Sequence, residues 1–302
     1  MKKFLIKLVV FLLPVLVLFC GLEWSIRHIP NDYNSKIKYI NQHGSEIEVL
    51  ALGSSHFYHG FNPDYLQAHT FNLAHIAQTP EFDLKLFQKF LPKLKNVKVL
   101  VYPISYFTFF WDLQSSSEAW RMKNYQIYYH VDAAQSFNDY FELLSISPDM
   151  NFKRIKDYYI KHKTEVGVTP KGWGFNCLAQ YAANLDETAI TSAQRHTAQD
   201  WNFYSKNSNE VEQILQLAQK KGIKVILVFP PAYKAYRNLV VPKQLQTTYL
   251  KIDSLLHQYP NTTFLDFFSD TTFTSKDFMD ADHLNDQGAI KMSKRINEVV
   301  RN

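Results

Sequence analysis

The chain has 302 residues, of which 46% are hydrophobic and 15% aromatic, so it can bury the core of one large domain or two small ones. Its 33 Lys and Arg against 28 Asp and Glu leave a net charge of +5 without a long basic run, which excludes the electrostatic footprint of nucleic-acid binding. The two cysteines, Cys20 and Cys177, exclude a disulfide framework, and we expect Cys177 to be a small buried residue.

The N-terminus has the composition of a membrane anchor. Three lysines lie in or before an apolar stretch, and Phe4–Leu22 is long enough to cross a hydrocarbon core of about 30 Å if Lys7 snorkels. The basic flank predicts a cytoplasmic N-terminus and an extracytoplasmic main domain, periplasmic or on the cell surface. A cleaved signal peptide is the alternative, but no small-residue cleavage site follows the apolar run. We therefore favour an uncleaved transmembrane anchor over 1–24.

Downstream of the anchor, polar residues 25–45 predict a linker, after which strand-like and helix-like segments alternate. The predicted strands are 46–53, 69–75, 96–105, 223–231 and 262–268. The predicted longer helices are 79–94, 207–222, 242–260 and 285–302. Such alternation is typical of a parallel sheet with helices on both faces. The sequence therefore predicts a three-layer α/β/α domain over 46–302 with about five parallel strands.

One long segment, at about 106–205, interrupts this alternation. It is rich in aromatic residues between Tyr106 and Tyr129, and amphipathic helices are expected around 134–165. We interpret it as a mainly helical insertion on the open side of the sheet. Its aromatic residues are expected to form a small core of their own, and the alternative is that they form a wall of a substrate site.

Two polar motifs lie where ligands bind in open α/β sheets, beyond the carboxyl ends of the strands. "GSSH" over 53–56 follows the first predicted strand, and "DADHLN" over 280–285 follows the fifth and precedes the last helix. A serine hydroxyl becomes a strong nucleophile when a base removes its proton. His283 can be that base for Ser55, and Asp280, three residues earlier, can fold back onto the other ring nitrogen, as in a Ser-His-Asp triad.

Each motif alone also has a structural interpretation. A serine pair after a strand commonly bonds to nearby backbone in a loop, and Asp-x-x-His is common as a helix cap with a surface histidine. The occurrence of both motifs, at opposite ends of one α/β pattern, favours catalysis. His56 and His59 invite a metal site, as do Asp280, Asp282 and His283. No HExxH or Cys/His cluster supports one, so we expect neither a metal nor another cofactor.

The two motifs resemble the first and last sequence blocks of the SGNH (GDSL-like) hydrolase superfamily. The resemblance covers about 46–105 and 205–302, and it implies a flavodoxin-like fold with Ser55 as nucleophile and Asp280 and His283 as its partners. With its anchor, the chain is also similar to DltD-like and alginate-acetylation-like cell-envelope acyltransferases. That similarity implies a cell-surface glycan as acceptor or substrate and a membrane-bound O-acyltransferase as partner.

The middle blocks of the chain depart from the family pattern. The family has a Gly after the second strand and a Gly-x-Asn-Asp after the third, where this chain has "FNLAHIAQ" and "YPISYF". The replacement oxyanion donors that we expect are Asn72, Ala74 and Ser105. Side chains considered for substrate binding, on their position alone, are Tyr106, Tyr233 and His196.

Two classes of function therefore follow from the sequence. The favoured one is a membrane-anchored, extracytoplasmic serine O-acyltransferase or O-acetyl esterase acting on a surface glycan through Ser55, His283 and Asp280. Transfer and hydrolysis are not separated, because a sugar hydroxyl and water attack the same acyl intermediate. The alternative is a catalytically inactive glycan-binding or assembly protein that keeps the fold, which the departures in the middle blocks favour.

Overall fold

The computed structural model describes residues 1–301, which divide into two compact units. The first unit comprises Met1–Ile37 and Ser117–Val166, and the second comprises Lys38–Ser116 and the chain from Gly167 to its described end. The segment predicted as an insertion is divided between them, because only its middle part belongs to the first unit. All of the candidate site residues lie in the second unit.

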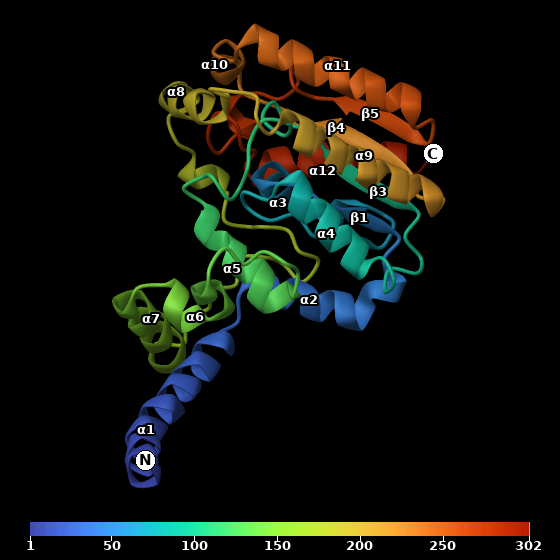
Figure 1. Ribbon diagram of the computed structural model, residues 1–302. Coiled ribbons are helices and arrows are strands. Elements are labelled where there is room, and N and C mark those ends of the chain that lie inside the picture. Colours follow the sequence, from blue (N-terminus) through green and yellow to red (C-terminus); the bar gives the residue numbers. More distant parts are fainter. Residues whose placement is uncertain (302) are drawn as a thin grey trace. The chain divides into compact units, whose positions relative to one another are not determined.

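The second unit is built on a parallel sheet, which in the described chain has five strands in the order β2-β1-β3-β4-β5 (Figure 1). The strands are β1 (Val49–Ala51), β2 (Thr70–Asn72), β3 (Val99–Pro103), β4 (Lys224–Phe229) and β5 (Thr262–Asp266). This is the flavodoxin-like strand order. The predicted α/β class with about five parallel strands is confirmed. Each strand is shorter than predicted, although β5 begins at the predicted residue.

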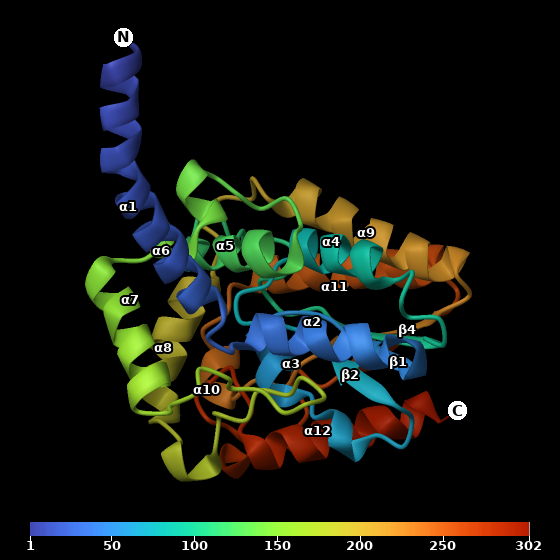
Figure 2. The same ribbon diagram turned by 90° about the horizontal axis from the view of Figure 1, so that it is seen from below.

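Helices cover both faces of this sheet, and Figure 2 shows the layers. One face carries α4 (Pro80–Phe90), α9 (Tyr204–Lys220) and α11 (Pro242–Gln258), and the other carries α3 (Ser55–Gly60) and α12 (Asp286–Val300). The central strands are consequently buried on both sides: Leu50, Leu100 and Leu227 are fully inaccessible. Two further helices of this unit are α8 (Leu185–His196) and α10 (Lys234–Arg237).

The register of the sheet brings the ends of β1 and β3 to the same edge. Ala51 of β1 pairs with both Asn72 of β2 and Val101 of β3. The segments that follow β1 and β3 therefore leave the sheet side by side, and these segments contain the GSSH motif and Ser105.

The first unit contains α1 (Lys2–Arg27), which is long and apolar enough to cross a membrane. A signal sequence has the same properties, and the side on which the rest of the chain lies is not determined by the helix. The predicted linker 25–45 is largely helical, since α1 extends to Arg27 and α2 covers Asp32–His43. Buried residues at helical spacing, Tyr33, Lys36 and Ile40, explain why α2 forms a packed helix and not a free tether.

The remainder of the first unit, residues 117–166, is called the lobe below. Its α-helices are short: α5 (Met122–Asn124), α6 (Glu142–Ser145) and α7 (Pro148–Ile155). The aromatic rings of Tyr125 and Tyr129 pack on Tyr33 of α2. At its centre, the buried Glu142 carboxylate accepts bonds from Lys123 at 2.6 Å and Arg154 at 2.9 Å. The lobe thus has a core of aromatic rings and one buried ionic cluster.

Candidate active site

The turn after β1 requires a glycine. Gly53 has φ +113°, and a Cβ at this position would lie 2.2 Å from Cγ of Pro103, the last residue of β3. Its N–H donates to a carboxylate oxygen of Asp83 at 2.8 Å. This tight turn sends the chain directly into α3, of which Ser54 is the N-cap and Ser55 the first residue.

Ser55 faces the histidine from the other end of the chain. Its Oγ lies 2.8 Å from Nε2 of His283. The opposite ring nitrogen, Nδ1, donates to Asp280, with 3.0 Å to each carboxylate oxygen. The three side chains expected to act together are therefore within hydrogen-bonding distance in series, although Ser55 and His283 are separated by 228 residues.

The loop that carries the histidine is held by its own backbone. Asp280 Oδ1 also accepts the N–H groups of Asp282 at 3.1 Å and His283 at 2.8 Å, which fixes its carboxylate against the ring. An antiparallel bridge closes the loop over Phe278–Leu284. Asn285 then caps α12 by accepting two N–H groups of its first turn. The "DADHLN" sequence thus forms a compact turn that orients the imidazole before the helix begins.

Two carboxylates control the charge of this histidine. Burial alone would lower the pKa of His283, but the negative charges of Asp282 and Asp280 outweigh burial and raise that pKa to about 9. Nδ1 of His283 lies 3.4 Å from Oδ2 of Asp282, in addition to its contact with Asp280. The resting histidine is consequently protonated at neutral pH.

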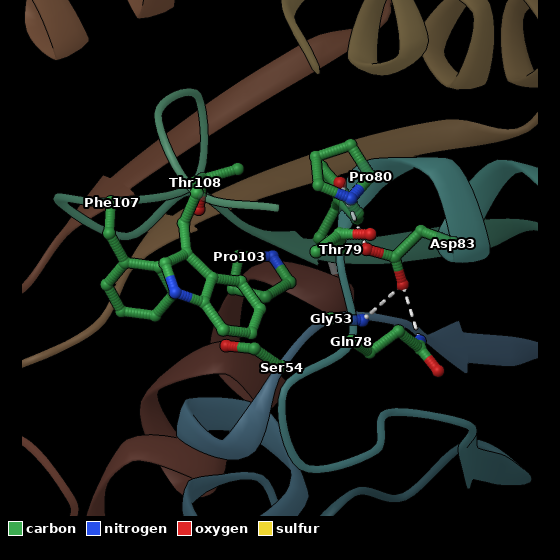
Figure 3. Close-up of a pocket in the computed structure, with 11 residues that line it drawn as sticks. Gly53, Ser54, Gln78, Thr79, Pro80, Asp83, Pro103, Phe107 and Thr108 are labelled. Carbon is green, nitrogen blue, oxygen red and sulfur yellow. Dashed lines mark hydrogen bonds between the residues drawn. The ribbon is translucent and has the colours of Figure 1, made fainter. Parts of the chain in front are cut away.

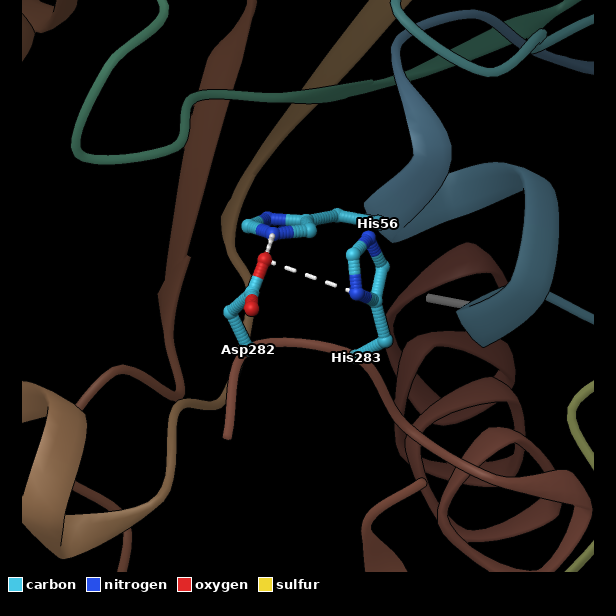
Figure 4. Close-up of side chains that lie close together, drawn as sticks. All are labelled: His56, Asp282 and His283. Carbon is cyan, nitrogen blue, oxygen red and sulfur yellow. Dashed lines mark hydrogen bonds and ion pairs between the residues drawn. The ribbon is translucent and has the colours of Figure 1, made fainter. Parts of the chain in front are cut away.

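A second buried network has Asp282 at its centre, where its carboxylate lies between the rings of His56 and His283 (Figure 4). Oδ2 of Asp282 is 3.3 Å from Nε2 of His56, whose Nδ1 is 2.8 Å from Oγ of Ser105. On the α8 side, Ser192 donates to Oδ1 of Asp282, and Nη2 of Arg195 lies 3.4 Å from Oδ2. Asp282 is fully buried, and the neighbouring charge of His283 and the bond from His56 hold its pKa well below the usual range despite that burial.

The other histidines near the site are neutral. Burial lowers the pKa of His56, and burial together with the charge of His283 lowers that of His59 to about 3. Burial also holds the pKa of His196 well below its ordinary value. Among these four rings, only His283 both faces Ser55 and titrates above neutrality.

The three residues expected to stabilise an oxyanion have their groups engaged elsewhere. The Asn72 side-chain amide donates to the carbonyls of Phe57 and Phe61 at 2.7 and 2.8 Å, and its oxygen accepts the Ala74 N–H. Ser105 bonds to His56 through its hydroxyl and donates its N–H to a threonine hydroxyl. These contacts argue against the expected oxyanion role, since Asn72 instead ties the end of α3 to β2.

The residues considered for substrate binding make contacts within the fold, and their role in binding stays a prediction. The Tyr106 hydroxyl is buried and accepts the N–H of Val241 at 3.0 Å. The backbone N–H of Tyr233 donates to the Ala281 carbonyl and so supports the histidine loop. His196 is buried, with Nδ1 2.9 Å from the hydroxyl of Tyr236.

A narrow pocket opens beside the glycine turn (Figure 3). The carboxylate of Asp83, which lines this pocket, accepts the Gly53 N–H and, at 2.6 Å, the side-chain amide of Gln78. Burial raises the pKa of Asp83 to about 7 in spite of these bonds. Asp83 therefore anchors the turn that precedes the two serines, and no local feature of the sequence distinguishes it from a surface acid of α4.

A metal ion is not needed to explain how closely the acidic and imidazole groups approach one another. Ligand atoms of His56, Asp282 and His283 lie within 4.8 Å of one another, the one such trio found in residues 1–301. Each side chain is already satisfied, because Asp282 bridges the two rings and their remaining nitrogens face Ser105 and Ser55. We derive no chemical step through a metal.

Comparison with known proteins gives one family match. The profile of a family described only as a protein of unknown function (DUF1574) matches residues 149–287. The matched segment is less than half of the chain and contains Asp280 and His283 but not Ser55. No curated protein matches the chain.

Several solved structures are similar to the chain at a low level. A candidate acylhydrolase from Bacteroides fragilis has 13% identity and a TM-score of 0.41, with 88% of this chain and 95% of that chain covered. A GDSL-like lipase from Bacteroides thetaiotaomicron has 12% identity and a TM-score of 0.43, with 89% and 98% covered. A candidate platelet activating factor from Streptococcus pneumoniae has 12% identity and a TM-score of 0.43, with 97% and 99% covered. Likeness at this level carries no conclusion about function, which must be argued from the site.

Proposed function

We propose that the chain is a membrane-anchored, extracytoplasmic serine acyl-transfer enzyme. The observation that carries the proposal is the series of close contacts from Ser55 Oγ to His283 Nε2 and from His283 Nδ1 to Asp280. In the forward step, Ser55 Oγ attacks an acyl carbonyl while His283 takes the serine proton. The ester bond to the leaving alcohol then breaks, and His283 returns the proton to that alcohol, leaving the acyl group on Ser55.

In the second half-reaction an acceptor hydroxyl attacks the acyl group while His283 takes its proton. The bond between the acyl group and Ser55 then breaks, and His283 returns the proton to Ser55 Oγ. A sugar hydroxyl of a cell-surface glycan is the proposed acceptor, and water gives the esterase variant. An open pocket lined by Arg195 combines the Trp111 ring with charged groups such as Asp200, which supports a polar acceptor. Arg195 also contacts Asp282, so this pocket adjoins the buried network.

The membrane anchor supports transfer in preference to hydrolysis, because it keeps the enzyme beside a donor delivered through the membrane. Retention of α1 is itself supported by packing: Ile26 in its last turn and Ile29 just after it are fully buried. Cleavage within or just after α1 would remove part of this buried packing. A membrane-bound O-acyltransferase remains the proposed supplier of the acyl group, on the resemblance alone.

The oxyanion donor that we propose is the backbone N–H of Ser55. The first N–H groups of a helix have no acceptor within it, and α3 begins at this residue. A donor aimed at the developing charge is worth on the order of 100–1000-fold in rate. The engagement of Asn72 and Ser105 elsewhere is also the observation that favours the alternative, an inactive glycan-binding or assembly protein.

Turnover of a simple ester separates the two functions. The full-length protein in detergent is incubated with p-nitrophenyl acetate, and release of p-nitrophenol is followed for the wild type, Ser55→Ala and Ser54→Ala. The proposal expects release by the wild type and Ser54→Ala and none above background with Ser55→Ala. Equal release by wild type and Ser55→Ala, or none by the wild type, would favour the inactive alternative.

A further inference from the structure

The lobe exposes large apolar side chains next to α1. Phe137, Phe152 and Ile160 have 72%, 68% and 69% of their surfaces exposed. Large exposed apolar surfaces mark sites that bind proteins or membranes. Both α6 and α7 pack against α1. The Tyr159 hydroxyl donates to the Ser25 carbonyl at 2.9 Å, so Ile160, its neighbour in the chain, is also near this helix.

The lobe is fixed to α1 at one level. The buried carboxylate of Glu23 accepts the N–H groups of Glu142 and Leu143, at 3.0 and 2.8 Å, and so caps the start of α6. One turn earlier on α1, the Phe19 ring lies 5.5 Å from the ring of Phe141, centroid to centroid. Because the cap specifies which turn of α1 is used, the lobe cannot slide along the helix.

The level of this attachment coincides with the expected membrane boundary. At 1.5 Å per residue, the roughly 20 residues from Phe4 to Glu23 span the hydrocarbon core of about 30 Å. Phe19 then lies about 6 Å inside the outer boundary. Trp24, which is 61% exposed, lies where interfacial aromatic residues gather. A group in contact with Phe19 is therefore at or below the lipid headgroups.

Contacts between aromatic rings connect Phe19 of α1 to the surface of the lobe. Phe141, which touches Phe19, in turn lies 5.2 Å from the exposed Phe137. Basic side chains accompany the apolar ones on the surface: Lys153, Lys156, Lys161 and Lys163 are exposed around Phe152 and Ile160 in the chain. A surface that combines apolar insertion with lysines has the chemistry that binds anionic lipid interfaces.

We propose that the lobe lies in the membrane interface, with Phe137 and Phe152 inserted among the headgroups of the leaflet from which α1 emerges. The lysines face the anionic headgroups of the same leaflet. This inference rests on the anchoring part of the proposed function and does not depend on acyl transfer. The first unit then contacts lipid through the lobe as well as through α1.

Spin-label accessibility in the full chain tests this placement. In a Cys20→Ala, Cys177→Ala background, single labels are placed by Phe137→Cys and Phe152→Cys. Val10→Cys in α1 reports on the anchor, and Leu250→Cys, 61% exposed on the second unit, is the matched aqueous control. The protein is reconstituted in vesicles of phosphatidylcholine and phosphatidylglycerol, and collisions with oxygen and with a water-soluble nickel chelate are measured.

The expected result is that labels at positions 137 and 152 collide with oxygen and are shielded several-fold from nickel relative to position 250. If they collide with nickel as freely as position 250 while position 10 is immersed, the lobe placement is wrong and the anchor stands. If position 10 is also in water, both fail. Shielding of positions 137 and 152 from both reagents would show that protein covers the patch, which would also overturn the proposal.

Discussion

Replacing Asp282 with Asn should make Ser55 more reactive at neutral pH, although Asp282 does not contact the serine. With the pKa of His283 near 9, only about 1% of the histidine is neutral at pH 7 and able to accept the serine proton. The wild-type rate should therefore rise about 50-fold from pH 7 to pH 9. Removing the Asp282 charge moves the pKa toward the ordinary 6.5, where about 75% is neutral at pH 7.

The assay is the rate of labelling by a fluorophosphonate, measured from pH 6 to pH 10 on the full-length protein. Comparing the two proteins at each pH cancels the pH dependence of the probe itself. Asp282→Asn should label at least about 10-fold faster than wild type at pH 7 and about equally at pH 10. A variant whose pH midpoint equals that of the wild type would refute the role of Asp282, provided that its thermal unfolding shows it to be folded.

Two further substitutions test the geometry. Asp280→Asn should slow labelling on the order of 100-fold or more even at pH 10, because the carboxylate that orients Nδ1 of His283 is lost. A labelling rate at pH 10 equal to that of the wild type would contradict this. In thermal unfolding, Gly222→Ala should lower the free energy of unfolding by about 1 kcal/mol, and Gly53→Ala should lower it by more. Both glycines have positive φ, but only at position 53 would a Cβ overlap another atom, so equal losses would count against the tight-turn assignment.

The parallel sheet is predictable because its strands are short apolar runs that alternate with helix signals outside the insertion. The ends of the strands are less predictable from the sequence. The first predicted strand, 46–53, forms ladder pairs only over Val49–Ala51, because the pairing with β2 begins at Thr70. The division into two units cannot be predicted from the sequence. Buried aromatic residues occur both before and after Ser117, although the two groups belong to different units.

Motif spacing placed Ser55, Asp280 and His283 near one edge, and the structure brings them within hydrogen-bonding distance, while their roles stay predictions. The importance of Asp282 could not be foreseen, although it lies inside the motif. Its partners Ser192 and Arg195 come from α8, and no local feature of the sequence shows that this helix packs against the histidine loop. The expected oxyanion donors rest on their position in the sequence. Whether a donor is available depends on its other hydrogen-bond partners, which the sequence does not show.

The central claim is that Ser55 is the nucleophile, and locating a covalent adduct tests it most directly. Full-length protein is labelled with a fluorophosphonate at pH 9, digested, and the modified residue is identified by fragmentation mass spectrometry. The claim predicts the phosphonyl group on Ser55, its loss in Ser55→Ala and its persistence on Ser55 in Ser54→Ala. An adduct on Ser54 or Ser105, or labelling undiminished in Ser55→Ala, would contradict it.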